Sequence, residues 1–279
     1  MEPKLRQIAD MLILNGTLTD CPGIIHGKTG IAIFFFHYAQ FTDKELFTDY
    51  ALDLIGEIQN QIHNNSPADY ETGLAGIGVG MDYLMNKGFL SADEDFFDDF
   101  DIRMYRAVMY DPWQNFSLYE GLSGYGRYWM KRLLQLKLPS TQAKECLKCI
   151  AGLIEENIQC IPEYEKSDVY CFLHDLSLIQ GLEIYKGLLE QCFEWNIPSL
   201  DINQSFSRLG YSTVGNIVRK YLFNQYFNQT HPKVIGIEIP DVDFEKSTSG
   251  MGLLTGYAGE GLLRLTAIIP SNILWMNLL

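Results

Sequence analysis

The chain has 279 residues, 47% of them apolar, and carries 35 acidic against 21 basic side chains, a formal charge of −14 at pH 7. This charge repels phosphate backbones and anionic lipids, so nucleic acid and a charged membrane surface are excluded as expected partners, whereas a cationic peptide is electrostatically favoured. No linker rich in proline, glycine or serine interrupts the sequence. We therefore predict a single domain over residues 1–279.

The composition also predicts the compartment. Residues 1–14 mix charged and apolar side chains, which is typical of an amphipathic helix and not of a secretion signal. No apolar run reaches the roughly 18 residues that a membrane span needs. Six cysteines are too few for a disulfide scaffold and fit reduced thiols. We expect a cytoplasmic protein with no membrane span.

A short glycine motif returns along the chain and opens an apolar run each time. Its copies are Gly27-Lys28-Thr29-Gly30, Gly73-Leu74-Ala75-Gly76, Gly121-Leu122-Ser123-Gly124 and Gly256-Tyr257-Ala258-Gly259. The first three lie 46 and 48 residues apart, and the final interval of 135 residues leaves room for two degenerate copies. This spacing predicts a repeat protein in which each unit buries its apolar face against its neighbours.

Hydrophobic periodicity predicts two kinds of helix around these motifs. Residues 42–62 and 140–158 carry one apolar stripe each, and a third helix of this kind is expected to begin at the capping box Ser91-Ala92-Asp93-Glu94. Residues 31–38, 77–85, 125–136 and 260–268 are apolar on most faces. The first kind suits an outer, half-solvated layer, and the second an inner, buried layer.

The sequence locates the two degenerate copies less clearly, because their glycines are displaced or missing. Residues 172–193 have a helical stripe with displaced glycines, and residues 208–213 keep a single glycine, Gly210, which we interpret as the first of its motif. Residues 228–250 have no helical period and contain a strand-like run at 234–239, which favours a functional loop or lid. The expected fold is an all-α toroid of about six helical hairpins, whose inner helix starts present free N–H groups to one central cavity.

The four motifs, read from about Gly23 to Leu265, resemble the lanthionine synthetase C-like family. This resemblance implies an α/α toroid and zinc-assisted cyclisation, in which a metal-bound cysteine thiolate of a peptide adds to dehydroalanine or dehydrobutyrine and forms a thioether ring. Zinc would serve there by lowering the pKa of the thiol and holding it beside its acceptor.

The resemblance also implies a zinc site of two cysteines and one histidine on the last two repeats. The matching positions of this sequence hold Arg208, Leu254 and Thr255, none of which is a thiolate or imidazole ligand. We therefore expect no zinc and no other cofactor, and a protein that binds a peptide or a peptide-modifying enzyme without cyclase activity. The family's histidine of the fourth repeat matches either His174 or Gln180, and both alternatives stay open.

Eight residues are the candidate lining of the central cavity, and they lie just before or within the glycine motifs or on the degenerate copies: His26, Glu71, Glu120, His174, Asp175, Arg208, Thr255 and Tyr257. No catalytic residue or metal ligand is assigned among them. Arg208 is interpreted as a holder of a ligand's carboxylate or other anion, because its guanidinium offers two parallel donors.

Two active-enzyme alternatives and one structural alternative remain. Glu71 and Glu120 would be the general acid and base of a carboxylate-dependent hydrolase, although acidic residues at helix starts are also expected from the helix dipole. Cys21, His26, Cys171 and His174 would be the ligands of a relocated metal site in a thioether cyclase. A structural or assembly protein would lack a pocket with converging polar groups.

Overall fold

The computed structural model describes residues 2–91, 96–135, 141–192, 195, 205–227 and 250–279. Within these ranges the chain is built from α-helices and short 3₁₀ segments, and no strand occurs beyond one isolated bridge between Gly250 and Gly256. The predicted all-α fold is confirmed. The strand-like run at 234–239 and residues 92–95 of the predicted capping box lie outside the described residues.

The helices form two layers, as predicted. The inner layer consists of α2 (Lys28–Thr42), α4 (Leu74–Asn86), α6 (Leu122–Gln135), α8 (Glu163–Ser177), α10 (Thr213–Tyr226) and α11 (Tyr257–Ile268). The outer layer consists of α1 (Pro3–Asn15), α3 (Glu45–Gln61), α5 (Asp98–Met109), α7 (Thr141–Asn157) and α9 (Lys186–Cys192). Helices α2 and α4 are buried on nearly every face, whereas α3 buries a single stripe that includes Leu54 and Ile58.

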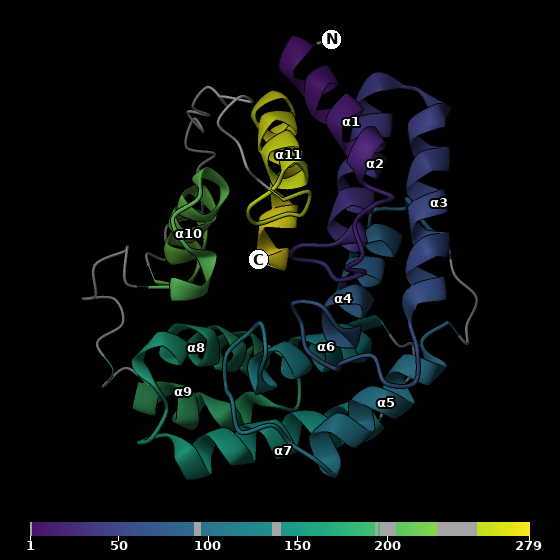
Figure 1. Cartoon of the computed structure of the whole chain (residues 1–279). Coiled ribbons are helices and arrows are strands. Elements are labelled where there is room, and N and C mark those ends of the chain that lie inside the picture. The colour runs from purple at the N-terminus through teal and green to yellow at the C-terminus, as the bar shows by residue number, and fades with distance from the viewer. Residues whose placement is uncertain (1, 92–95, 136–140, 193–194, 196–204, 228–249) are drawn as a thin grey trace.

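The inner helices form a closed ring. Helix α2 packs against α4, α4 against α6 and α6 against α8; α10 packs against α11, and α11 returns to α2 (Figure 1). Between α8 and α10 the hydroxyl of Tyr226 donates a hydrogen bond to Asp175 over 2.9 Å. The architecture is therefore an α/α toroid.

The glycine motif is explained by the loop that precedes each inner helix. This loop crosses the first helical turn so closely that a Cβ atom on the second glycine would overlap the carbonyl oxygen six residues earlier. The pairs are Gly30 with Ile24, Gly76 with Tyr70, Gly124 with Leu118, Gly215 with Leu209, and Gly259 with Leu253. The motif thus marks the start of an inner helix.

Glycines further along the inner helices permit the close approach of neighbouring helices. A Cβ atom on Gly126 would meet the ring of Phe172 on α8, and one on Gly261 would meet the ring of Phe34 on α2. These glycines therefore leave room for an aromatic ring of the adjacent inner helix.

The register predicted for the fifth copy was wrong by two residues. Gly215, not Gly210, occupies the glycine position against the loop, so the first position of this motif is Ser212. The Ser212 hydroxyl accepts the Gly215 N–H over 2.9 Å and caps α10. A serine cap replaces the glycine, which is why the pattern of glycines did not locate this helix start.

The helix predicted over 172–193 for the fourth copy was also wrong in its bounds. Helix α8 begins at Glu163 after Pro162 and ends at Ser177, and a 3₁₀ turn at Glu183–Tyr185 leads into α9. Gly181 has a φ of +86°, a left-handed conformation that breaks the helix. The apolar stripe in the sequence therefore belongs to two helices joined by a turn.

The first-turn N–H groups are not free in four of the six inner helices, contrary to our expectation. They donate to carbonyl groups of the preceding loop, which satisfies donors that a helix start normally leaves open. The bonds are Lys28 to Cys21 (2.9 Å), Leu74 to Pro67 (2.9 Å), Leu122 to Asn115 (2.8 Å) and Tyr257 to Gly250 (3.1 Å).

The centre of the ring holds the last part of the chain. The 3₁₀ segment Pro270–Leu278 follows α11, and Figure 1 places its end in the middle of the molecule. The carbonyl of Leu278 accepts the Tyr70 hydroxyl over 3.1 Å, and that of Leu279 accepts Nε of Arg208 over 3.0 Å. The single open cavity expected at the centre is therefore filled by residues 270–279.

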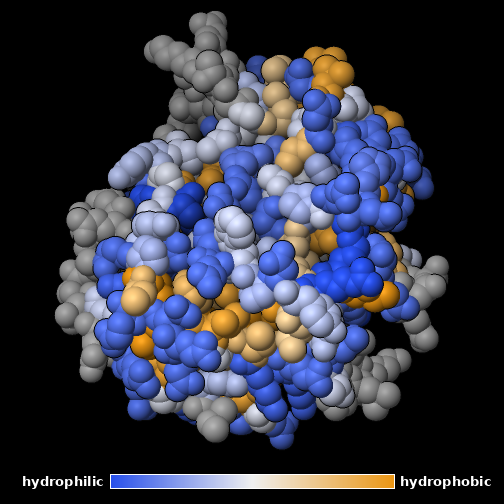
Figure 2. Space-filling model, turned by 60° about the horizontal axis from the view of Figure 1, so that its bottom comes forward, coloured by the Kyte–Doolittle hydropathy of each residue, from blue (hydrophilic) through white to orange (hydrophobic). Residues whose placement is uncertain are grey.

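The face that carries α5 and α7 is mainly hydrophilic, with apolar residues visible between hydrophilic ones (Figure 2). Among the helices that the structure describes, none is long and apolar enough to cross a membrane.

Candidate functional site

The loops before the inner helices are hydrogen-bonded to one another along one end of the ring. We call this end the rim; it comprises residues 21–27, 67–73, 115–121 and 250–256. Three backbone bonds connect neighbouring loops: Leu253 N–H to the Ile25 carbonyl (2.8 Å), Ile25 N–H to Glu71 (3.4 Å), and Tyr70 N–H to Tyr119 (2.8 Å). The rim is therefore a continuous surface that follows directly from the repeats.

Four of the predicted residues lie on the rim. His26 and Glu71, from neighbouring loops, form a pair with 3.0 Å between Nε2 and Oε1, and both side chains are partly exposed. Thr255 is exposed on the loop that is bonded to that of His26, and Glu120 is exposed on the third loop. The repeats thus bring these four residues to one end of the ring, whereas the sequence analysis expected them to line a central cavity.

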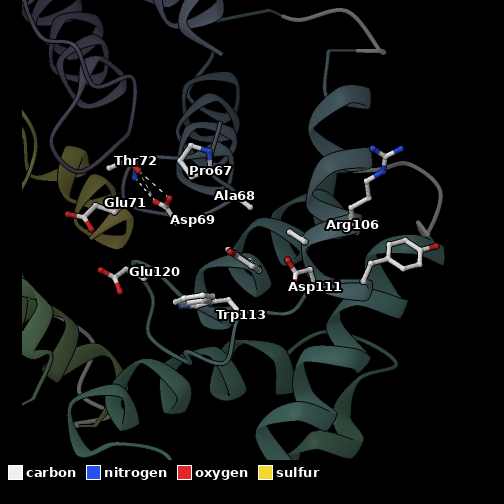
Figure 3. Close-up of a pocket in the computed structure, with 12 residues that line it drawn as sticks. Pro67, Ala68, Asp69, Glu71, Thr72, Arg106, Asp111, Trp113 and Glu120 are labelled. Carbon is white, nitrogen blue, oxygen red and sulfur yellow. Dashed lines mark hydrogen bonds between the residues drawn. The ribbon is translucent and has the colours of Figure 1, made fainter. Parts of the chain in front are cut away.

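A cleft of about 830 Å³ opens between the second rim loop, the third rim loop and the end of α5. We call it the rim cleft. Figure 3 shows Glu71 and Glu120 on adjacent loops at one end of it, with Trp113 beside Glu120 and with Asp111 and Arg106 at the α5 end. The rim cleft therefore contains two of the eight predicted residues.

The rim cleft is acidic. Asp69, Glu71, Asp111 and Glu120 line it, against one basic side chain, Arg106. Asp69 is partly engaged within its own loop, because its Oδ1 accepts the N–H groups of Thr72 over 2.7 Å and Gly73 over 3.2 Å. Glu71 pairs with His26 at the edge of the cleft, whereas Asp111 and Glu120 are exposed.

Aromatic side chains form the other wall of the cleft. Tyr110 is 77% exposed and Trp113 is 61% exposed, which is unusual for large rings and offers apolar contact to a ligand. Burial, followed by the charges of Asp69 and Asp111, raises the pKa of Tyr125 in the wall to about 12. The cleft thus combines negative potential with exposed aromatic surface.

The residues that sequence reasoning missed are Tyr110, Asp111 and Trp113. They lie on the connection between α5 and the third rim loop, which has neither helical period nor glycine motif. The only signal in the sequence was a short aromatic and acidic stretch around Pro112. Repeat spacing locates the rim loops but does not indicate which outer connection folds over them.

Arg208 lies near the centre of the ring, and its donors are bonded to other groups of the same chain. Its Nη1 donates to Asp168, its Nε donates to the Leu279 carbonyl over 3.0 Å, and its guanidinium packs on the rings of Tyr119 and Phe206 at 5.6 and 5.2 Å. Burial lowers the pKa of Arg208 to about 10, which leaves it charged at neutral pH. The anion that Arg208 holds in this structure is Asp168.

The remaining predicted residues lie elsewhere. Asp175 accepts Tyr226 and pairs with Nδ1 of His174 over 3.1 Å, about 10 Å along α8 from Asp168 at 1.5 Å per residue. Tyr257 is buried at the start of α11. The eight residues are therefore not brought together in one cavity: four lie on the rim, and only Asp175 and Arg208 meet in the lining of a small central cavity of about 20 Å³.

The zinc site that the resemblance implies does not fit the donors present. With the corrected register, the position two residues before the start of the fifth motif is Gly210, which has no side chain to bind a metal. Leu254 is buried and Thr255 is exposed at the sixth motif. A zinc site needs thiolate, imidazole or carboxylate ligands, and these positions supply none.

The relocated metal site is not assembled either. Among the described residues no group of three or more histidine, cysteine, aspartate or glutamate side chains is placed to hold a metal ion. Cys21 lies in the first rim loop, whereas Cys171 is buried on α8, where burial raises the pKa of its thiol. A buried, protonated thiol is a poor metal ligand.

Comparison with known proteins agrees with the fold. The sequence pattern of the family described as lanthionine synthetase C-like protein matches residues 21–171, which is more than half of the chain and runs from the first rim loop into α8. No curated protein matches the chain. On this match and on its ring of glycine-initiated inner helices, the chain belongs to the lanthionine synthetase C-like family.

Proposed function

We propose that this member of a family related to peptide modification binds a cationic peptide segment in the rim cleft, and that it does so without zinc-dependent cyclisation. The segment belongs either to a peptide undergoing maturation or to a peptide-modifying enzyme. The observation that carries the proposal is the rim cleft itself, an acidic and aromatic groove of about 830 Å³.

Charge is the first support. Glu71, Asp111 and Glu120 from three different segments converge on one groove, and the whole chain carries −14. Such a groove attracts lysine and arginine side chains and raises their rate of encounter, an effect that weakens as salt increases.

Shape is the second support. The cleft falls within the range of 300–1,000 Å³ that is typical of ligand sites. The ring of Trp113 and the ring of Tyr110 lie exposed beside the carboxylates, so that they can pack on the aliphatic stems or cationic heads of basic side chains. A peptide that alternates basic and apolar residues uses both features.

The experiment that tests this proposal is titration calorimetry with two peptides that differ only in charge. One is a short lysine-rich peptide, and the other has glutamate in place of each lysine. We expect the lysine peptide to bind at least ~10-fold more tightly at low salt, and its affinity to fall as salt is raised. Equal affinities for the two peptides would contradict the proposal.

Paired variants place the binding in the cleft. Asp111→Asn combined with Glu120→Gln removes two charges from the rim cleft and is expected to weaken the binding of the lysine peptide by about tenfold. Asp49→Asn combined with Asp53→Asn removes two exposed charges from α3, which does not line the cleft, and is the matched control. If both pairs weaken binding equally, long-range charge and not the cleft attracts the peptide.

The active-enzyme alternatives make different predictions. A cyclase with a relocated site would purify from zinc-supplemented medium with one zinc per chain, whereas we expect elemental mass spectrometry to find far less than one. A carboxylate-dependent hydrolase would lose turnover in Glu71→Gln or Glu120→Gln. In the structure Glu71 already pairs with His26 over 3.0 Å, and Glu120 is exposed at the edge of the rim cleft.

A further inference from the structure

A second pocket, of about 340 Å³, lies between α6, α8, α10 and the segment Pro270–Leu278. Most of its lining residues lie in the last turns of α6, α8 and α10 or just after them, so it opens at the end of the ring opposite the rim; Arg127, in the second turn of α6, and Asn277 lie deeper. We call it the far pocket. It shares no residue with the rim cleft, and it is independent of the function proposed for that cleft.

Three buried polar atoms of the far pocket's lining have no hydrogen-bond partner among the described residues. They are Nη1 of Arg127 on α6, Oε1 of Gln225 on α10, and Oδ1 of Asn277 on the central segment. Buried polar atoms in native proteins are nearly always paired with protein or with ordered water, so three unpaired atoms on three elements around one space offer hydrogen bonds to a bound molecule, either water or a ligand. They supply one charged donor and two acceptors.

The charge of the far pocket is opposite to that of the chain as a whole. Arg127 and Lys131 lie four residues apart on α6, so they project on the same face of the helix. Neither forms an ion pair with a described carboxylate. Asp175 also lines the pocket, and its two oxygens interact with His174 and Tyr226. Its charge also acts on Arg127, as that of Asp82 does on Lys131. Two cations thus face one pocket of a protein whose formal charge is −14.

The rest of the wall is apolar. Met130 and Leu134 on α6 and Leu178 and Ile179 after α8 line the far pocket. Leu134 is 67% exposed and Leu178 is 71% exposed, so they form an open apolar mouth beside the two cations. A ligand that fits this pocket carries a negative group, hydrogen-bond donors and an apolar part in one molecule.

We propose that the far pocket binds the carboxylate end of an apolar α-amino acid, either as the free amino acid or as the last residue of a peptide. The carboxylate lies at Arg127 and Lys131, and the nitrogen of the same residue donates to Gln225 and Asn277. The apolar side chain packs on Met130 and Leu178. Guanidinium and ammonium groups recognise carboxylates in this way, and a volume of 340 Å³ suits a ligand of this size.

Titration calorimetry on the full chain with three small probes tests the proposal. L-leucine carries both carboxylate and ammonium, N-acetyl-L-leucine imitates the last residue of a peptide, and L-leucinamide lacks the carboxylate. We expect at least one of the two carboxylates to bind, and leucinamide to bind at least ~10-fold more weakly. Tighter binding of N-acetyl-L-leucine identifies a peptide end, and tighter binding of L-leucine identifies the free amino acid. Binding of neither carboxylate, or equal binding of leucinamide, overturns the proposal.

Two variants locate the site. Lys131→Met keeps the aliphatic stem and removes the charge. It is expected to lower the affinity for the carboxylate ligand by roughly tenfold. Lys148→Met, at an exposed position on α7 outside the far pocket, is the matched control. Arg127 is left unchanged because its guanidinium also packs on Tyr70 at 5.7 Å. If Lys131→Met binds as tightly as Lys148→Met, with both variants shown to be folded by circular dichroism, the proposal is overturned.

Discussion

At the scale of the residue, Arg208 shows that a charged side chain suited to binding a ligand can instead form a buried ion pair within the chain. Sequence analysis favoured a ligand-binding role, because the register predicted there placed Arg208 where the family resemblance implies a zinc ligand. In the structure it holds Asp168, whose side chain is 2% exposed, and the carbonyl of Leu279. Asp168 in turn accepts the Leu118 N–H over 2.8 Å, so this pair connects α8 to the rim. Sequence spacing cannot distinguish a charge that awaits a ligand from one that the chain already satisfies.

Replacement of Arg208 by methionine is expected to lower the free energy of unfolding by about 3–5 kcal/mol, because it leaves the buried carboxylate of Asp168 without its partner. Arg6→Met removes a charge that is 73% exposed and is expected to change stability by no more than ~0.5 kcal/mol. Urea denaturation of both variants measures the difference. A cost for Arg208→Met as small as that for Arg6→Met would mean that Arg208 is not a structural residue.

His37 is expected to make stability depend on pH. It is buried on α2 and its Nε2 lies 2.7 Å from the Tyr83 hydroxyl; burial, reinforced by Lys87, lowers its pKa from 6.5 to about 4. The unfolded chain therefore takes up a proton near pH 6.5, whereas the folded chain does so only near pH 4. Stability is full above pH 6.5 and falls as the pH is lowered, by about 2 kcal/mol at pH 5.

The variant His37→Gln isolates this contribution, because the other histidines contribute equally to both proteins. Its unfolding free energy is expected to approach that of the parent protein as the pH is lowered from 7 to 5. Urea denaturation across this range provides the measurement. Curves that stay parallel would show that His37 does not titrate in the way its burial requires.

At the scale of the element, the start of each inner helix is where sequence and structure agree best. Four starts were predictable because a loop backbone crosses the first helical turn and excludes every Cβ atom, so that only glycine fits. The other two use different solutions. Ser212 caps α10 with its hydroxyl, and α8 begins directly after Pro162 without a side-chain cap, while its Glu165 and Asp168 accept the N–H groups of Phe116 and Leu118 in the loop before α6. A search for glycines in the sequence cannot find a helix start that is formed without the glycine motif.

Two glycine substitutions test this explanation of the motif. Gly76→Ala places a Cβ atom against the carbonyl oxygen of Tyr70 and is expected to destabilise the protein by about 1–3 kcal/mol. Gly56→Ala lies in α3 with nothing within 4 Å of the new atom, and is expected to stabilise by about 0.5–1 kcal/mol. Urea denaturation followed by circular dichroism compares them. Equal effects would mean that the conformation of glycine, and not the crossing loop, explains the motif.

At the scale of the whole molecule, the ring was predictable and its interior was not. The spacing of the repeats and two kinds of hydrophobic pattern define a toroid of inner and outer helices. Nothing in the sequence of residues 270–279 indicates that they fold back into the centre, because their contacts with Tyr70 and Arg208 join distant parts of the chain. The expected central site is therefore replaced by a cleft on the rim and a pocket at the opposite end.

The candidate site follows the same division. Glu71 and Glu120 were found because they belong to the repeating loops, whereas Asp111 and Trp113 belong to a connection that is not repeated. Residues that belong to the repeating loops can be located from the repeat spacing in the sequence. Positions that depend on how one outer connection folds require the three-dimensional structure.

The measurement that separates a peptide-binding ring from a zinc-dependent cyclase most directly is the loss of free thiol from a bound peptide. The full chain is incubated with zinc and a lysine-rich peptide that carries one cysteine and one dehydroalanine, at concentrations where calorimetry shows binding. Because thioether closure leaves the mass unchanged, the remaining thiol is counted by alkylation and mass spectrometry. We predict that the thiol disappears no faster with the chain than without it. A zinc-dependent increase in that rate would contradict the proposed function.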